Sequence, residues 1–184
     1  MVHYEQRVRL RIDLIKTKPS FSKKDLLIAV FLLGIFLPLY TIGIYNIPHQ
    51  VNTDEIHIGN YFQQAVTIKK LDLFGLSDYF DFPFGVFYFY GLIEKTLGGF
   101  DFFHARLAHA IVGAFIVVPC YLLFRTFYTV FWALIATVLV MTNHSLFAIS
   151  RMVSRNNFLL FNAVLAYLLL FLGLKNGSFF LSFI

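Results

Sequence analysis

The chain has 184 residues, of which 59% are apolar and only 14% charged, and its mean hydropathy is +0.73. Because an average soluble domain has about 45–50% apolar and about 25% charged residues, this composition excludes an ordinary soluble domain and predicts an integral membrane protein. The net charge of +5 comes largely from a basic segment directly before an apolar run, a placement that indicates membrane topology and argues against nucleic-acid binding.

The first predicted element is a basic cytoplasmic segment over residues 1–25. Its basic side chains are Arg7, Arg9, Arg11, Lys16, Lys18, Lys23 and Lys24. Lysine and arginine before a span are retained on the cytoplasmic side, and they also favour anionic lipid headgroups. The segment differs from a secretory signal peptide, because the apolar run behind it is too long and lacks a small-residue cleavage site.

Four apolar runs have the length of about 20 residues that a helix needs to cross the hydrocarbon core. They lie near residues 26–45, 104–124, 126–149 and 156–174. Only the region around Arg125 separates the second run from the third, which predicts a tight hairpin of antiparallel helices. The single cysteine, Cys120, lies inside an apolar run, where we expect a buried apolar side chain with no disulfide partner in the chain. The predicted fold class is therefore all-α: a polytopic membrane protein with about four transmembrane helices.

A long loop over residues 46–103 separates the first two runs, and with a cytoplasmic N-terminus it lies at the outer face. Its few basic residues are Lys69, Lys70 and Lys95, which agrees with the positive-inside rule. We expect two short helices in this loop, near residues 54–70 and 83–97. The second contains most of an aromatic-rich stretch over residues 82–93, which is too short to span and is suited to the membrane interface or to a re-entrant segment.

The C-terminal residues, from Phe179 to Ile184, begin another apolar run after Lys175-Asn-Gly-Ser. This run resembles the start of a fifth span, so we expect the chain to be a fragment of a longer protein. Residues 26–184 as a whole are predicted to form one membrane domain, located in the plasma membrane if the source is prokaryotic.

Asp54, Glu55 and His57 lie close together just outside the first span. Asp54 and His57 are three positions apart, so on a helix they share a face. A carboxylate beside an imidazole is suited to general-base chemistry or to binding a divalent cation. A solvated acidic helix start, capped by Asn52 or Thr53, accounts for the same residues without a function. The spacing alone leaves these interpretations open.

Three further places bring charge to the predicted outer face. Asp81 stands before a proline-containing turn, where it is a candidate site residue or a helix cap. Arg106 begins the second span and either snorkels to the interface or pairs with a carboxylate of the loop. Arg151 and Arg155 follow the third span, against the positive-inside trend. Guanidinium groups there are suited to a lipid phosphate, and ordinary turn charges are the alternative.

In this order, these features resemble the N-terminal part of GT-C membrane glycosyltransferases, above all the dolichyl-phosphate-mannose protein mannosyltransferases and the aminoarabinose lipid A transferases. The first outer loop of the mannosyltransferases begins Asp-Glu-x-His-Phe-Gly, and here it reads Asp54-Glu55-Ile56-His57-Ile58-Gly59. Ala105-Arg106-Leu107 at the second span and Ser150-Arg151 after the third also fit. The family's second motif, Asp-x-His-Pro-Pro-Leu-Gly, is reduced to Asp81-Phe82-Pro83-Phe84-Gly85, and Asn156 stands where the family has an acidic residue.

The resemblance covers most of residues 20–175. It implies inverting transfer of a sugar from a polyprenyl-phosphate donor to a protein, glycan or lipid acceptor at the outer membrane face. It implies that Asp54 is the base that deprotonates the acceptor hydroxyl or, with His57, a ligand of a divalent metal ion. No other cofactor is expected.

The same resemblance implies substrate-positioning roles for the remaining charged residues. Glu55 is expected to pair with Arg106 and so to order the loop. Arg151 is expected near the donor phosphate, and Asp81 together with His57 is expected to shape the site. This set is chemically sufficient, because a carboxylate activates the hydroxyl while positive charge stabilises the departing lipid phosphate.

Two other functions remain open from the sequence. A non-enzymatic scaffold subunit would leave Asp54, Glu55 and Arg106 facing lipid or water separately. A transporter would place polar residues near the bilayer centre on several helices, and the predicted spans offer little beyond His109 and Asn162.

Overall fold

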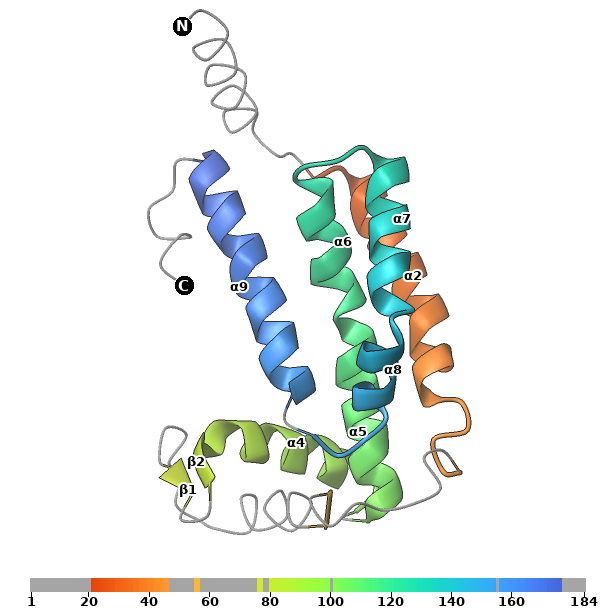
Figure 1. Cartoon of the computed structure of the whole chain (residues 1–184), viewed down its shortest axis with the longest axis vertical. Coiled ribbons are helices and arrows are strands. Elements are labelled where there is room, and N and C mark those ends of the chain that lie inside the picture. Colours follow the sequence, from red (N-terminus) through yellow and green to blue (C-terminus); the bar gives the residue numbers. More distant parts are fainter. Residues whose placement is uncertain are drawn as a thin grey trace, which may run out of the picture.

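The computed structural model describes residues 21–46, 55–56, 76–77, 80–99, 101–154 and 156–176. These residues form helices together with one short two-stranded hairpin. In chain order the elements are α2 (Lys23–Thr41), β1 (Leu76–Ser77), β2 (Phe80–Pro83), α4 (Phe84–Leu97), α5 (Phe102–Phe115), α6 (Val117–Arg125), α7 (Val130–Met141), α8 (His144–Ser150) and α9 (Asn156–Asn176) (Figure 1). The predicted helical fold class is confirmed, and the hairpin is a small addition to it.

Three helical stretches are long and apolar enough to cross a membrane: Lys23–Thr41, Phe102–Arg125 and Asn156–Lys175. A fourth crossing comes from α7 and α8 if this pair, which is bent by 59°, is one broken span. Figure 1 shows these helices running alongside one another, with α4 lying across their lower end. The chain is thus an integral membrane protein whose described part has three to four membrane-crossing helices.

Helix α2 begins and ends at recognisable signals. At its start, the Ser22 hydroxyl accepts a hydrogen bond from the Asp25 amide at 3.2 Å, while the Asp25 carboxylate accepts one from the Ser22 amide at 2.9 Å. This reciprocal arrangement is a capping box, which satisfies amides that have no partner inside the helix. Shortly after its end, Gly43 has a φ of +65°, the left-handed conformation that terminates many helices and that glycine adopts without strain.

The second crossing is interrupted at Ile116, between α5 and α6. Pro119 has no amide hydrogen and therefore cannot donate to the carbonyl of Phe115 one turn earlier. The helical pattern resumes at once, because the Cys120 amide donates to the Ile116 carbonyl at 3.0 Å. Cys120 itself is buried, as the sequence predicts.

The third crossing differs from the continuous run predicted over residues 126–149. It starts only at Val130 and divides at Thr142 and Asn143. The Asn143 side chain accepts hydrogen bonds from the amides of Ser145 and Leu146 at 3.0 and 3.3 Å, so it caps a new helix and stops the old one. An apolar count cannot detect this, because a single polar residue barely changes the mean hydropathy of the run.

The core lies where α2 packs on α5 and α6, and where α6 packs on α7 and α9. Small residues permit close approach at the contact between α5 and α8. A Cβ atom on Gly113 would lie only 2.4 Å from the Ser150 hydroxyl oxygen. A second apolar cluster joins α4 to α5 and contains Val86, Tyr90 and Val112. Through it, α4 is fixed against the crossing helices at the end of the bundle where α5 begins.

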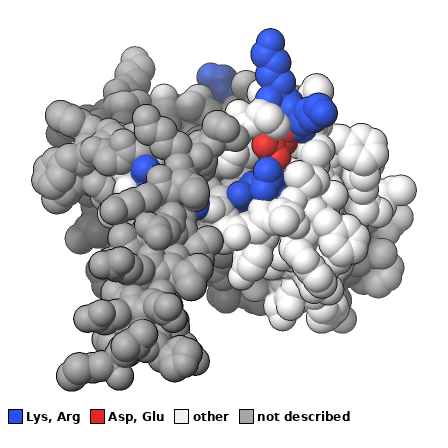
Figure 2. Space-filling model, turned by 90° about the horizontal axis from the view of Figure 1, so that it is seen from above, with Lys and Arg blue, Asp and Glu red and all other residues white. Residues whose placement is uncertain are grey.

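At the end of the bundle where α2 begins, charged residues join three elements. Arg125 donates to the Asp25 carboxylate at 2.7 Å, and the Tyr121 hydroxyl donates to the same carboxylate at 3.3 Å. The Lys175 ammonium at the end of α9 donates to the Thr126 carbonyl. Figure 2, which views the molecule from this end, shows basic side chains gathered around a small acidic surface. We call Asp25 and Arg125 the inner pair, after the side of the membrane that the sequence predicts for this end.

Candidate functional site

At the opposite end, a buried ion pair joins the loop to the second crossing. Arg106 of α5 donates from Nε to Glu55 Oε1 at 3.3 Å and from Nη2 to Glu55 Oε2 at 3.1 Å. The side chains of Arg106 and Glu55 are 6% and 2% exposed. Two parallel hydrogen bonds of this kind fix orientation as well as distance. The pairing that the family resemblance implies is present, and we call it the outer pair.

The outer pair also reaches the turn between α8 and α9. The backbone amide of Val153 donates to Glu55 Oε1 at 2.8 Å, and Val153 is itself buried. One carboxylate thereby connects the loop entrance, the start of α5 and the turn before α9, although Glu55 and Val153 are 98 positions apart in the sequence. Glu55 is therefore a structural link between three segments at the predicted outer face.

Arg151, at the end of α8, is bound to the end of α2. Its Nη1 donates to the Tyr40 carbonyl at 3.1 Å and its Nη2 to the Ile42 carbonyl at 2.8 Å. The guanidinium also lies 5.2 Å from the ring centroid of Phe147. Carbonyls at the end of a helix lack intrahelical partners and carry partial negative charge, so a cation is favourable there. The pKa of Arg151 is lowered by burial.

A row of buried polar groups runs from this turn into the bundle. The Ser150 hydroxyl donates to the Asn157 side-chain oxygen at 3.2 Å, and the Asn157 amide donates to the His109 carbonyl at 3.3 Å. His109 places Nδ1 2.7 Å from the Ala105 carbonyl, and its ring stacks on Tyr90 with centroids 3.8 Å apart. These contacts fix α9 and α4 against α5 directly beside the outer pair.

Glu94 of α4 is a second buried carboxylate at this end, with 2% of its surface exposed. Within the described part of the chain its Oε1 has no hydrogen-bond partner. Burial, with a smaller contribution from the negative charge of Asp101, raises the pKa of Glu94 to about 8. At neutral pH this pKa favours the protonated form of Glu94.

The remaining predicted site residues fall partly outside the described residues. Asp54 and His57, together with most of the helix predicted over residues 54–70, are not among them. The backbone of Asp81 belongs to β2, and its side chain is not among those described. Among the described side chains, no three His, Cys, Asp or Glu residues are grouped so as to hold a metal ion. That finding does not apply to the proposed metal ligands Asp54 and His57, because they lie outside the described residues.

The described site thus brings together Glu55, Arg106 and the turn that carries Arg151. Residues that the sequence did not single out as part of it are Tyr90, Glu94 and Asn157. For Asn157 a signal existed, namely an amide at the start of an apolar span, where buried polar groups need partners. For Tyr90 no signal existed, because one aromatic residue among many on α4 has no distinguishing neighbour in the sequence.

Comparison with known proteins gives one match. The model of the family described as dolichyl-phosphate-mannose-protein mannosyltransferase matches residues 28–179, which contain the outer pair, Arg151 and the described crossings from Ile28 onward. Searches of the curated proteins and of the solved structures gave no match.

Proposed function

The chain belongs to the dolichyl-phosphate-mannose-protein mannosyltransferase family of GT-C glycosyltransferases, and from that premise we propose that it transfers mannose from a polyprenyl-phosphate donor to an acceptor hydroxyl at the outer membrane face. The observation that carries the proposal is the outer pair. A buried bidentate link between Glu55 and Arg106 fixes the backbone next to Asp54, the carboxylate that the family motif provides.

In the proposed reaction Asp54 accepts the proton of the acceptor hydroxyl as the oxygen attacks the anomeric carbon of the donor. The bond from that carbon to the phosphate oxygen breaks, and the polyprenyl phosphate leaves with the electron pair. Attack from the face opposite the phosphate inverts the configuration. A positioned general base contributes typically about 10²–10⁴-fold to such a rate. If a divalent ion takes part, Asp54 and His57 are its proposed ligands.

The arginines have different proposed roles. Arg106 is proposed to be a positioning residue, because its guanidinium forms a buried ion pair with the Glu55 carboxylate. Both terminal nitrogens of Arg151 donate to backbone carbonyls, those of Tyr40 and Ile42 at the end of α2. We therefore propose that Arg151 contributes positive electrostatic potential at the donor phosphate and does not bind it through two hydrogen bonds. His57 and Asp81 are proposed to shape the acceptor side of the site.

Charge placement supports an orientation with the N-terminus in the cytoplasm. The end that carries the inner pair also has Lys23, Lys24 and Lys175 and so carries a net positive charge. Among the described residues at the other end, Lys95, Arg106 and Arg151 are balanced by the carboxylates Glu55, Glu94 and Asp101. Basic residues predominate on the cytoplasmic side of membrane proteins. In this orientation the outer pair lies on the extracytoplasmic side, where a lipid-linked donor rather than a nucleotide sugar is expected.

The donor assignment is tested with the full chain in lipid nanodiscs, offered radiolabelled mannose either on polyprenyl phosphate or on guanosine diphosphate, with a hydroxylated peptide as acceptor. The proposal predicts transfer from the lipid-linked donor alone. Transfer from the nucleotide sugar, or none from the lipid-linked donor to peptide, glycan or lipid acceptors, would contradict it.

A further inference from the structure

The turn between α8 and α9 supplies one of the hydrogen bonds that hold Glu55. Glu55 Oε1 accepts from Arg106 Nε at 3.3 Å and from the Val153 amide at 2.8 Å. The two donors come from separate segments, α5 and this turn, and they converge on a single oxygen atom. The position of Glu55 therefore depends on how the turn is held relative to α5.

Two buried polar side chains, Ser150 and Asn157, join the two ends of this turn. The Ser150 hydroxyl donates to Asn157 Oδ1 at 3.2 Å, and Asn157 Nδ2 donates to the Ile149 carbonyl at 3.4 Å. Ser150 and Asn157 are both fully buried. Side-chain hydrogen bonds thus close the turn at its base, where the chain leaves α8 and enters α9.

The base of the turn is also attached to the face of α5 that carries Arg106. Asn157 Nδ2 donates to the His109 carbonyl at 3.3 Å. Ser150 lies so close to Gly113 that a Cβ atom on that glycine would be 2.4 Å from the hydroxyl oxygen. Arg106, His109 and Gly113 follow one another at spacings of three and four positions, so they share one face of the helix. The turn is thereby attached to α5 at a defined distance from the outer pair.

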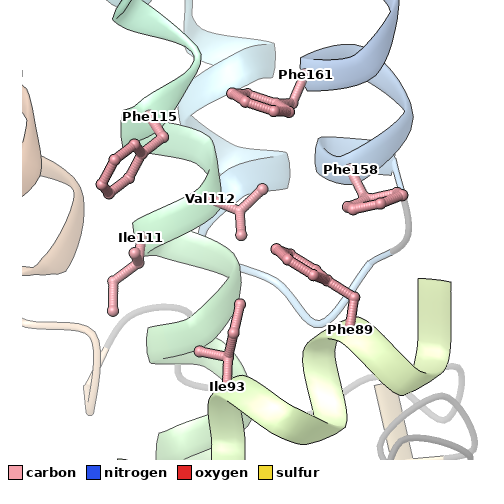
Figure 3. A pocket seen from close by; sticks show the side chains of 7 residues that line it. All are labelled: Phe89, Ile93, Ile111, Val112, Phe115, Phe158 and Phe161. Atoms are coloured by element: carbon pink, nitrogen blue, oxygen red, sulfur yellow. The ribbon is translucent and has the colours of Figure 1, made fainter. Parts of the chain in front are cut away.

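The neighbouring contact between α9 and the other helices is apolar and has no preferred direction. Figure 3 shows the space between α4, α5 and α9, which has a volume of about 210 Å³ and is lined by apolar side chains, with Phe158 and Phe161 contributed by α9. Because hydrophobic contacts are non-directional, they leave the rotation of α9 about its axis weakly defined. The hydrogen bonds of Asn157 depend on angle as well as distance, and so they define that rotation.

We propose that Asn157 is a positioning residue for sugar transfer, which acts through the turn between α8 and α9. It keeps the Val153 amide and Arg106 at the separation at which both donate to Glu55. Glu55 in turn places the neighbouring Asp54. The inference rests on the proposed function, in which Asp54 is the base. Because a displacement of about 1 Å at a reacting group can cost about 100-fold in rate, a small shift of the turn is enough to slow catalysis.

The first test removes the hydrogen bonds and keeps the packing. Asn157→Leu replaces the amide by an apolar group of similar size, and Ser150→Ala removes only the hydroxyl. Hydrogen bonds between membrane helices contribute little to stability, so we expect both variants to insert and fold, and either remains informative if the other does not. The matched control is Asn162→Leu on the exposed face of α9, where the amide donates to the Phe158 carbonyl of its own helix.

We expect kcat per folded molecule to fall about tenfold or more in both turn variants, with the KM values for donor and acceptor within about twofold of the wild type. The control should change neither quantity. A role in stability alone would lower the unfolding midpoint and leave kcat per folded molecule unchanged. An unchanged kcat in a folded turn variant therefore overturns the inference.

The second test follows the turn independently of activity. Hydrogen–deuterium exchange in nanodiscs reports how well the Val153 amide is protected by its bond to Glu55. We expect the peptide that contains Val153 to exchange about tenfold faster in Asn157→Leu than in the wild type or in Asn162→Leu. Unchanged exchange would overturn the inference. If exchange is faster while the wild type transfers no mannose from the lipid-linked donor, the proposed function fails and the hold of Asn157 on Glu55 stands.

Discussion

The inner and outer pairs use the same chemistry at opposite ends of the bundle, and their surroundings differ. In the inner pair the Asp25 side chain is only 3% exposed and also caps its own helix, but Arg125 keeps 22% of its side chain exposed and so remains in reach of water. In the outer pair both side chains are almost fully buried, and Glu55 also holds the Val153 amide. The inner pair joins helices that pack against each other anyway. The outer pair attaches a loop segment to the bundle.

This difference indicates what each pair is for. Exposed ion pairs contribute about 0–1 kcal/mol, because water solvates the separated charges well. A buried pair is a weak source of net stability, but the loss of one partner leaves an uncompensated charge that costs about 3–5 kcal/mol. The inner pair therefore adjusts stability, and the outer pair fixes the position of the loop entrance at Glu55. Four substitutions test this contrast, in order of decreasing expected effect.

Glu55→Gln should have the largest effect. The amide retains the size of the side chain but removes the negative charge that the Arg106 guanidinium faces in this buried pair, and the loss of such a charge costs about 3–5 kcal/mol. We expect a marked fall in the midpoint of thermal unfolding and a loss of at least about 100-fold in mannose transfer, measured per folded molecule in nanodiscs. A variant that transfers mannose at the wild-type rate would show that the outer pair does not position the site.

Arg106→Lys should have an intermediate effect. Lysine keeps the positive charge but cannot form two parallel hydrogen bonds with a carboxylate. We expect stability within about 1–2 kcal/mol of the wild type and a fall of roughly tenfold in kcat. The matched control is Arg125→Lys in the inner pair, which should leave kcat unchanged. Equal losses of kcat in both variants would remove the functional distinction between the two ends.

Asp25→Asn should have a smaller effect, confined to stability. Asparagine is also a good capping residue, so the variant removes the charge while it preserves much of the helix start. We expect a loss of about 0.5–1 kcal/mol, seen as a small fall in the unfolding midpoint, and an unchanged rate per folded molecule. A large loss of transfer by correctly inserted protein would mean that the inner end also takes part in catalysis.

Glu94→Gln should have the smallest effect on mannose transfer and should change the pH dependence of stability. The folded-state pKa of Glu94 is about 8, above its usual value of 4.5, because burial disfavours the charged form. Its contribution is therefore fully present below about pH 4.5 and is lost as pH rises through about 8. Unfolding midpoints from about pH 5 to 9 should decline in the wild type and stay flatter in the variant. If the midpoints of the wild type and the variant changed with pH in parallel, the raised pKa of Glu94 would be contradicted.

Much of the fold was predictable because membrane-crossing helices follow directly from apolar run length. Ser22 and Asp25 show why the first helix starts several residues before the apolar run: a capping box extends it outward. The break at Asn143 was not predictable, because it depends on one side chain capping the following helix. The position of α4 depends on packing between residues far apart in the sequence, such as the Tyr90 ring on His109. Such contacts produce no periodic pattern from which the sequence could predict them.

The candidate site was predictable to the extent that chemistry is local. The pairing of Glu55 with Arg106 followed from the resemblance to the mannosyltransferases, because the residues alone left Arg106 either snorkelling to the interface or pairing with some loop carboxylate. The third contact of Glu55, with the Val153 amide, could not, because any backbone amide is an equal candidate in the sequence. Arg151 was predicted near a phosphate, and its observed partners are carbonyls of α2 that the sequence could not associate with it.

We propose that the loop entrance held by the outer pair carries the catalytic base, Asp54. The most direct measurement is the single-turnover rate of mannose transfer from polyprenyl-phosphate-mannose by the Asp54→Asn variant, compared with wild type and with Asp25→Asn. We expect a rate at least about 100-fold lower for Asp54→Asn, with wild-type membrane insertion and unfolding midpoint, and an unchanged rate for Asp25→Asn. Transfer by Asp54→Asn at the wild-type rate would contradict it.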